Sequence, residues 1–186
     1  MNKALLSTVL AVTAIASGAL AFAPTARAAT PDGTVTFQGK VLSSTCTVSN
    51  ASGGNVAVTL PDVVKTAFTG QGSVAGLTPF SLNLTGCPTT PSGVKVAAQF
   101  TGATIDGSTG ALTNGTGTGM SNVEVQMTDG SGNPINLSSN NTPVNATIGG
   151  TGAATLGYEA QYFQPTATAV TAGSVNTSVS FTLVYN

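Results

Sequence analysis

Cysteine and carboxylate side chains are the main candidates for chemistry in this chain, because its 186 residues include no histidine. Without an imidazole, Ser-His-Asp and Cys-His catalysis and ordinary zinc sites are excluded. The carboxylates are scattered, and no motif supports a glycosidase-like pair. The Gly-rich run Thr113–Gly119 lacks the Lys and the following helix of a phosphate-binding P-loop, so we interpret it as a loop. We therefore expect neither an enzyme nor a bound cofactor or metal.

The first residues have the pattern of a signal peptide. A short positive start, Met1–Lys3, precedes a mostly apolar stretch, Ala4–Ala23. Ala26 and Ala28 then occupy the −3 and −1 positions of an A-x-A cleavage site. We predict cleavage after Ala28, which would remove residues 1–28 from the folded protein. An uncleaved membrane anchor is the alternative, because the apolar stretch is nearly long enough to span a bilayer.

Cys46 and Cys87 are expected to form a disulfide. They are the only two cysteines, and both follow the predicted signal peptide, so they would reach an oxidising compartment. The bridge would close a loop of about 40 residues, for which the loop-entropy model gives a stabilisation of about 4 kcal/mol. A catalytic or metal-binding role would need a histidine or further cysteines, which the sequence lacks.

The elements that must position these residues are strands. Apolar and polar residues alternate with a period of two in several stretches, which is typical of half-buried strands. Val63–Ala67 is the only candidate for a short helical turn, and Thr101–Ser121 is expected to be a long loop or weak strands. The β-branched composition and the Gly/Asn/Ser turns favour an all-β fold, an antiparallel β-sandwich. The alternating stretches are 34–41, 56–60, 80–84, 94–100, 123–127, 158–162 and 175–185.

Charge and length narrow the possible functions. Five basic and six acidic residues leave a net charge of −1. Nucleic-acid binding needs clustered Lys and Arg, so no nucleic-acid partner is expected. The length is typical of one domain. No second apolar span follows the signal peptide, so we do not expect the exported chain to be embedded in a membrane.

Two of the alternating stretches have no obvious partner. The stretch 34–41 lies ahead of the first cysteine, and the chain stops inside the stretch 175–185. A long apolar sheet edge promotes aggregation unless something covers it. The N-terminal stretch could fold back and close its own domain. Alternatively, a strand from another chain could cover the edge, which is donor-strand complementation.

Several segments of this chain, taken together in their order and spacing, resemble those of a known protein family. They are Gly33–Val41, Cys46–Val48, Val58–Val63, Pro79–Cys87, Asn122–Met127, Tyr158–Phe163 and Phe181–Asn186. Together with the export signal, they resemble structural pilins of the chaperone–usher (type 1 fimbrial) class, in particular a major subunit. The resemblance covers the whole exported chain and includes the penultimate Tyr that is characteristic of the family. The final Asn186 departs from the Gln or Glu that is frequent there.

The resemblance implies an incomplete immunoglobulin-like β-sandwich that lacks its seventh strand and so contains a hydrophobic groove. A strand of a periplasmic chaperone would fill the groove first, and the N-terminal extension of the next subunit would replace it in the fibre. Residues 29–45 would be this extension, and residues 46–186 the pilin domain. The implied donor-strand residues are Val35, Phe37, Gly39 and Val41. The implied groove and chaperone-contacting residues of the last strand are Val179, Phe181, Leu183 and Tyr185.

Two of these assignments have alternatives. Gly39 would lie where the groove floor leaves no room for a side chain, but an ordinary strand bulge would also explain a glycine there. Phe37 could instead be a core residue of its own domain.

The resemblance implies a structural subunit of a surface fimbria that supports cell adhesion. Its partners would be neighbouring pilin subunits, a periplasmic chaperone and an outer-membrane usher, and it would reach the cell surface through the periplasm. A minor adaptor or tip-associated pilin of the same system is the alternative. A carbohydrate-binding adhesin would carry an extra lectin domain and lack the extension. Here the extension is present, and the chain has no room for a second domain.

Overall fold

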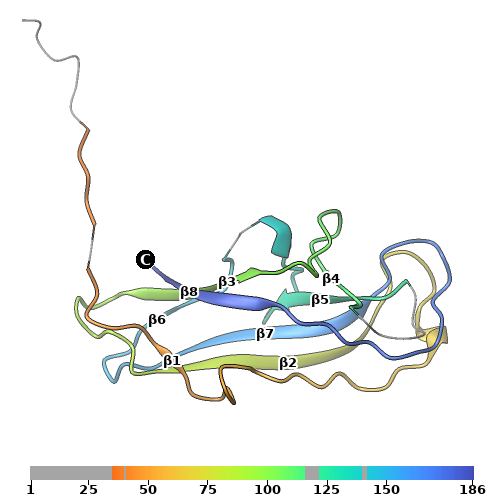
Figure 1. The fold of residues 1–186 in the computed structure, drawn as a ribbon, viewed down its shortest axis with the longest axis horizontal. Helices are drawn as coiled ribbons and strands as arrows, with labels where there is room; N and C mark the ends of the chain where they lie inside the picture. The colour runs from red at the N-terminus through yellow and green to blue at the C-terminus, as the bar shows by residue number, and fades with distance from the viewer. Residues whose placement is uncertain (1–34, 40, 116–121, 140–141) are drawn as a thin grey trace, which may run out of the picture. The chain divides into compact units, whose positions relative to one another are not determined.

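The computed structural model describes residues 35–39, 41–115, 122–139 and 142–186. The predicted signal peptide, residues 1–28, lies outside them, as does its cleavage site. Residues up to Gly39 and those from Lys40 onward form two separate units, and each is described by itself. The second unit consists of two antiparallel β-sheets (Figure 1).

The larger sheet has five strands in the order β1-β2-β7-β5-β4. Its long central pair places Leu82 opposite Leu156, and the next pair places Met127 opposite Ala160. All four side chains are buried, so the period-two pattern directs one face of this sheet into the core. The strands are β1 (Thr47–Val48), β2 (Val74–Thr85), β4 (Leu112–Thr113), β5 (Glu124–Asp129) and β7 (Ala154–Phe163).

The smaller sheet has three strands in the order β6-β3-β8. They are β3 (Lys95–Thr101), β6 (Asn145–Thr147) and β8 (Ser180–Tyr185). Among the described strands, β8 has only β3 as a neighbour, with Phe100 opposite Phe181. Two short 3-10 helices, η1 (Lys65–Ala67) and η2 (Leu137–Ser139), complete the elements. The first of them confirms the short turn predicted at Val63–Ala67.

An aromatic cluster joins the two sheets in the core. The ring of Tyr158 in β7 stacks on Phe80 of β2, with centroids 5.5 Å apart. It also meets the ring of Phe100 in β3 edge-on at 5.4 Å, and Phe100 packs against Phe181 of β8. Burial raises the pKa of Tyr158 to about 12. The shared core confirms the all-β sandwich predicted from composition.

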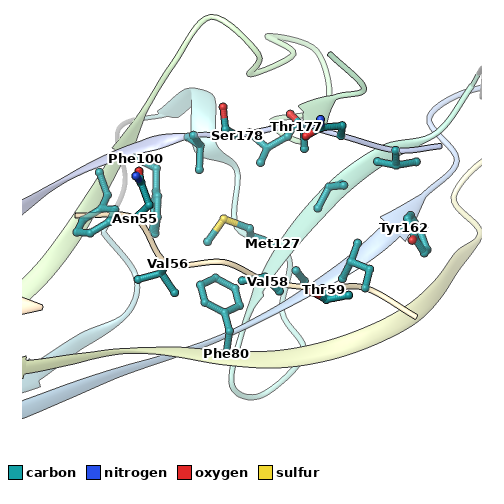
Figure 2. A pocket seen from close by; sticks show the side chains of 18 of the residues that line it. Asn55, Val56, Val58, Thr59, Phe80, Phe100, Met127, Tyr162, Thr177 and Ser178 are labelled. Atoms are coloured by element: carbon teal, nitrogen blue, oxygen red, sulfur yellow. The ribbon is translucent and has the colours of Figure 1, made fainter. Parts of the chain in front are cut away.

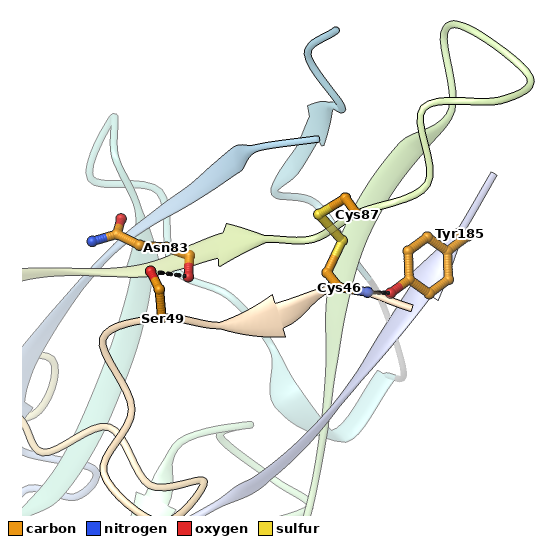
Figure 3. Close-up of a disulfide and its surroundings, with 5 residues drawn as sticks. All are labelled: Cys46, Ser49, Asn83, Cys87 and Tyr185. Atoms are coloured by element: carbon orange, nitrogen blue, oxygen red, sulfur yellow. Dashed lines mark hydrogen bonds between the residues drawn. A yellow bond between two sulfur atoms is a disulfide. The ribbon is translucent and has the colours of Figure 1, made fainter. Parts of the chain in front are cut away.

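The predicted disulfide is confirmed. Cys46 and Cys87 are joined with an S–S distance of 2.04 Å, and both residues are buried (Figure 3). The bridge lies at the end of the β1–β2 pair, where Thr47 is opposite Thr85. It therefore connects neighbouring antiparallel strands early in the domain.

Three stretches with the strand pattern, residues 35–39, 56–60 and 175–179, form no strand within this chain. The strand predictions for residues 56–60 and 175–179 are therefore wrong, whereas residues 35–39 are predicted to pair in another subunit. Their side chains still alternate from residue 56 to 60 and from 175 to 179 between half-buried and exposed. A strand also needs a neighbour whose N–H and C=O groups complete its ladder, and no described strand supplies one here. The sequence analysis also missed the short strands β1 and β6.

Candidate functional site

An open groove of about 930 Å³ lies between two of these incomplete strands (Figure 2). We call residues 54–62 the first rim and residues 173–181 the second rim, which continues into β8. Figure 2 shows the first rim, with Val56 and Val58, running opposite Thr177 and Ser178 of the second rim. The groove therefore follows the direction of the strands and has the form of a missing strand.

The floor of the groove consists of apolar core side chains from both sheets. Met127 lies between the two rims in Figure 2, and Phe80 and Phe100 also line the groove. The groove is therefore an opening into the hydrophobic core, which water reaches unless another apolar group fills it. The floor residues are Phe80, Leu82, Phe100, Leu112, Val125, Met127, Ala160 and Tyr162.

Within the described part of the chain, the second rim presents unpaired backbone groups toward the open side. Lys95 and Asn186 exchange both N–H···O bonds, each 2.9 Å long. In an antiparallel pair such bonds recur at every second residue, so the even-numbered residues of β8 bond to β3. The odd-numbered residues direct their N–H and C=O groups away from β3. Their side chains are half-buried, whereas Asn176, Ser178 and Ser180 are exposed.

Beyond Asn55, which pairs with Ser52, the described first rim is also unpaired. No backbone hydrogen bond joins residues 56–62 to another residue in the described part of the chain. Val56, Val58 and Leu60 are half-buried against the core, and Ala57 and Thr59 are exposed. Two facing edges with free backbone groups, above an apolar floor, match the requirements of one additional β-strand.

Charge lies at only one end of the groove. Asp62 lines it, and beside Asp62 a smaller hollow of about 200 Å³ is bordered by Lys65, Tyr162 and Val175. Burial and the charge of Asp62 raise the pKa of the Tyr162 hydroxyl. The remaining floor carries no ionisable side chain other than this tyrosine, so apolar packing and backbone hydrogen bonds would dominate the binding of an occupant.

The last-strand residues singled out in the sequence lie at two different places. Val179 and Phe181 line the groove. Leu183 and Tyr185 lie further along β8, where they pack against the core beyond the groove lining. The Tyr185 hydroxyl accepts a hydrogen bond from the backbone N–H of Cys46 (Figure 3).

The residues predicted to form a donor strand are exposed. Val35 and Phe37 expose 76% and 90% of their surface, and Val41 exposes 97%. Nothing lies within 4 Å of the place where Gly39 would carry a Cβ atom. Val35, Phe37 and Gly39 belong to the first of the two units.

Sequence reasoning missed the first rim and most of the floor. It treated residues 56–60 and 123–127 as ordinary strands, because alternation marks a half-buried face whether or not the edge is paired. Within the described ranges, no group of three His, Cys, Asp or Glu side chains could hold a metal ion. No helix in the same ranges is long and apolar enough to cross a membrane.

Comparisons with known sequences agree on one family. The family model described as "FimA: Type-1 fimbrial protein, A" matches residues 60–186. The chain is 41% identical over 177 residues to "Major fimbrial subunit SMF-1" of Stenotrophomonas maltophilia (strain K279a), covering 90% of this chain and 99% of that protein. It is 38% identical over 175 residues to the "F17 fimbrial protein" of Escherichia coli, covering 90% and 95%.

Solved structures of fimbrial proteins are also similar to this chain. A Burkholderia pseudomallei antigen and type I fimbria protein is 31% identical, with a TM-score of 0.53 over 76% of this chain and 90% of that one. The P pilus rod subunit PapA has a TM-score of 0.60 over 77% of this chain and 100% of its own. Its identity is 20%, so this likeness concerns the fold. It confirms the incomplete immunoglobulin-like sandwich expected from the sequence.

Proposed function

The chain belongs to the type-1 fimbrial protein family, and from this premise we propose that it polymerises into a surface fimbria by donor-strand exchange. As a member of this family it is a structural fimbrial subunit and not an enzyme, and other pilin subunits are its partners. The observation that carries the proposal is the groove, whose two rims have unpaired backbone groups above an apolar floor.

A strand in the groove would satisfy both requirements at once. Its N–H and C=O groups would pair with the odd-numbered residues of the second rim, and every second side chain would fill the floor. The stretch around Phe37 has this pattern, because Val35, Phe37, Gly39 and Val41 share one face of an extended chain. We therefore assign the donor role to the corresponding stretch of a second copy of this chain.

The groove also explains the need for a chaperone and an usher. An exposed apolar groove beside a free sheet edge promotes aggregation. A subunit in the periplasm therefore needs a temporary occupant, which we assign to a strand of a periplasmic chaperone, before an outer-membrane usher adds it to the fibre. The destination is the cell surface, where the fibre supports adhesion.

The relatives favour a rod subunit over an adaptor or tip subunit. The relative named as a major fimbrial subunit aligns over 99% of its length.

Deletion of residues 30–43 tests the proposal. The truncated chain keeps its groove, so it should capture an added peptide of residues 30–43 as a one-to-one complex but form no polymer. The same peptide should block polymer growth by the full exported chain, residues 29–186. A peptide with Ser in place of Val35, Phe37 and Val41 is the matched control and should do neither. Normal polymerisation of the truncated chain, measured by intact-complex mass and electron microscopy, would show that the donor assignment is wrong.

A further inference from the structure

Two polar side chains hold the second rim on the side away from the groove. The amide Nδ2 of Asn114 donates to the carbonyl oxygen of Ser174 at 3.0 Å. The backbone N–H of Asn176 donates to Asn114 Oδ1 at 2.9 Å. The hydroxyl of Thr104 donates to the carbonyl oxygen of Ser178 at 2.6 Å. We call Asn114 and Thr104 the clasp.

The described bonds from the clasp to the second rim all go to even-numbered residues. The residues of β8 that bond to β3 are also even-numbered. The clasp therefore bonds to the second rim on the same side on which β3 bonds to β8. Strand β3 ends at Thr101 and pairs no further than Ser180, so it cannot hold residues 174–178. Among the described residues, a backbone bond from the N–H of Gly115 to the carbonyl of Asn176 adds to the clasp. The odd-numbered residues keep their N–H and C=O groups available for an occupant.

The clasp is itself anchored to the opposite sheet. Thr113 of β4 donates to the carbonyl oxygen of Thr104 from its N–H at 2.7 Å and from its hydroxyl at 3.1 Å. Strand β4 pairs with β5, through Leu112 opposite Val125, at the edge of the five-stranded sheet. The second rim continues β8 of the three-stranded sheet. The clasp therefore fixes the rim of one sheet to the edge of the other.

We propose that Asn114 and Thr104 are positioning residues that keep the second rim extended while the groove is empty, so that it is ready to accept a strand. This inference rests on the proposed function of the groove. Ordering a free backbone segment costs conformational entropy for each residue. A site that is already ordered avoids this cost at the moment of binding. Without the clasp, the rim becomes ordered only when the strand binds, and the affinity falls accordingly.

The test measures binding of a fluorescent peptide of residues 30–43 to the full exported chain at high dilution. Asn114→Ala and Thr104→Val each remove hydrogen bonds to the rim, and each should weaken the peptide Kd by about 3- to 10-fold, the effect of roughly one net hydrogen bond. Thr104→Ser keeps the hydroxyl and should bind like the native chain. Asn145→Ala is the matched asparagine control, because Asn145 lies on β6, at the other edge of the three-stranded sheet.

Hydrogen exchange of the empty chains separates a local role from general destabilisation. The amide of Asn176 should exchange faster in Asn114→Ala, and the amides of β2 and β7 should be unchanged. If both Asn114→Ala and Thr104→Val bind the peptide with native affinity, or more tightly than the native chain, the proposed role of the clasp is wrong. The proposed function of the groove would be unaffected by either result. If the peptide fails to bind the native chain, the proposed function itself is wrong, and the clasp falls with it. If Asn114→Ala does not fold, the comparison of Thr104→Val with Thr104→Ser decides the question.

Discussion

The hydroxyl of Tyr185 accepts a hydrogen bond of 2.7 Å from the backbone N–H of Cys46, a residue 139 positions earlier (Figure 3). Tyr185 lies in β8, opposite Val96 of β3. Cys46 is joined by its disulfide to Cys87, which follows β2. The bond therefore connects the three-stranded sheet to the five-stranded sheet beside the disulfide.

Tyr185→Phe should lower the free energy of unfolding by about 1 kcal/mol, because the partly buried N–H of Cys46 loses its acceptor while the aromatic packing remains. Urea unfolding of the oxidised protein measures the change. A variant as stable as the native chain would show that this bond contributes nothing net.

Replacing Cys46 and Cys87 together by Ser should cost about 4 kcal/mol, from the loop-entropy model for a sequence separation of 41. That is a large part of the total stability of a typical domain, so the yield of soluble subunit should fall sharply. Urea unfolding of the native chain with and without reductant gives the same comparison without mutation. Equal midpoints in the two conditions would contradict the prediction.

Gly39→Leu should slow strand exchange when this chain is the donor. If residue 39 faces the groove of the next subunit, a Leu there overpacks the floor at a cost of about 1–3 kcal/mol. Chaperone co-purification should be nearly unchanged, because the chaperone binds this subunit's groove and not its extension. The control is Gln38→Leu, whose side chain points to the other face. Equal exchange rates for the two variants would reject the inward orientation of residue 39.

Ala160→Leu should block the groove from the acceptor side. Ala160 is 5% exposed and lines the floor, so a larger side chain there occupies space that the donor needs. Overpacking of about 1–3 kcal/mol corresponds to a loss of roughly 5- to 150-fold in affinity for the peptide of residues 30–43. Thr155→Leu, on the exposed face of the same strand, should bind normally. Normal binding by Ala160→Leu would place the donor elsewhere.

Glu124→Gln should stabilise the protein more at pH 7 than at pH 4. Burial raises the pKa of this carboxyl, the hydroxyl of Thr109 opposes the shift by donating to Oε2 at 2.6 Å, and the charge of Asp106 raises the pKa further. A carboxyl whose pKa is higher in the folded than in the unfolded state favours folding at low pH, and this advantage is lost as the pH rises through the folded-state pKa. Gln keeps the acceptor without the charge. Urea unfolding at the two pH values measures the difference.

Asp129→Asn is a control, because its effect on stability should have the opposite sign from that of Glu124→Gln at pH 7. Hydrogen bonds from the side chain and backbone of Asn133 and from the backbone of Ser131 lower the pKa of Asp129. Its carboxylate therefore stabilises the folded state above the unfolded-state pKa, and this contribution is lost as the pH falls through the lower, folded-state pKa. The variant should be less stable than the native chain at pH 7, with a smaller difference in stronger acid. The same pH trend in both variants would contradict the two assignments.

Features that depend on local pattern or on simple counts could be predicted from the residues alone. Alternation of period two identified all of β8, most of β3 and β5, and part of β2 and β7, because a half-buried strand has its two faces in consecutive residues. Two cysteines in a chain predicted to be exported identified the Cys46–Cys87 bridge, because no other pairing exists within the chain.

Which strands have partners could not be predicted in this way, because it depends on contacts between distant segments. Residues 56–60 and 175–179 alternate as clearly as the paired strands, but hydrogen bonding in a sheet is set by neighbours far away in the sequence. The floor likewise combines side chains of β2, β3, β4, β5 and β7, and the clasp joins Asn114 to Ser174, 60 positions later. Such contacts leave no periodic signal, because each depends on how two sheets pack and not on the residues beside it. The groove is for this reason a property of the assembled sandwich.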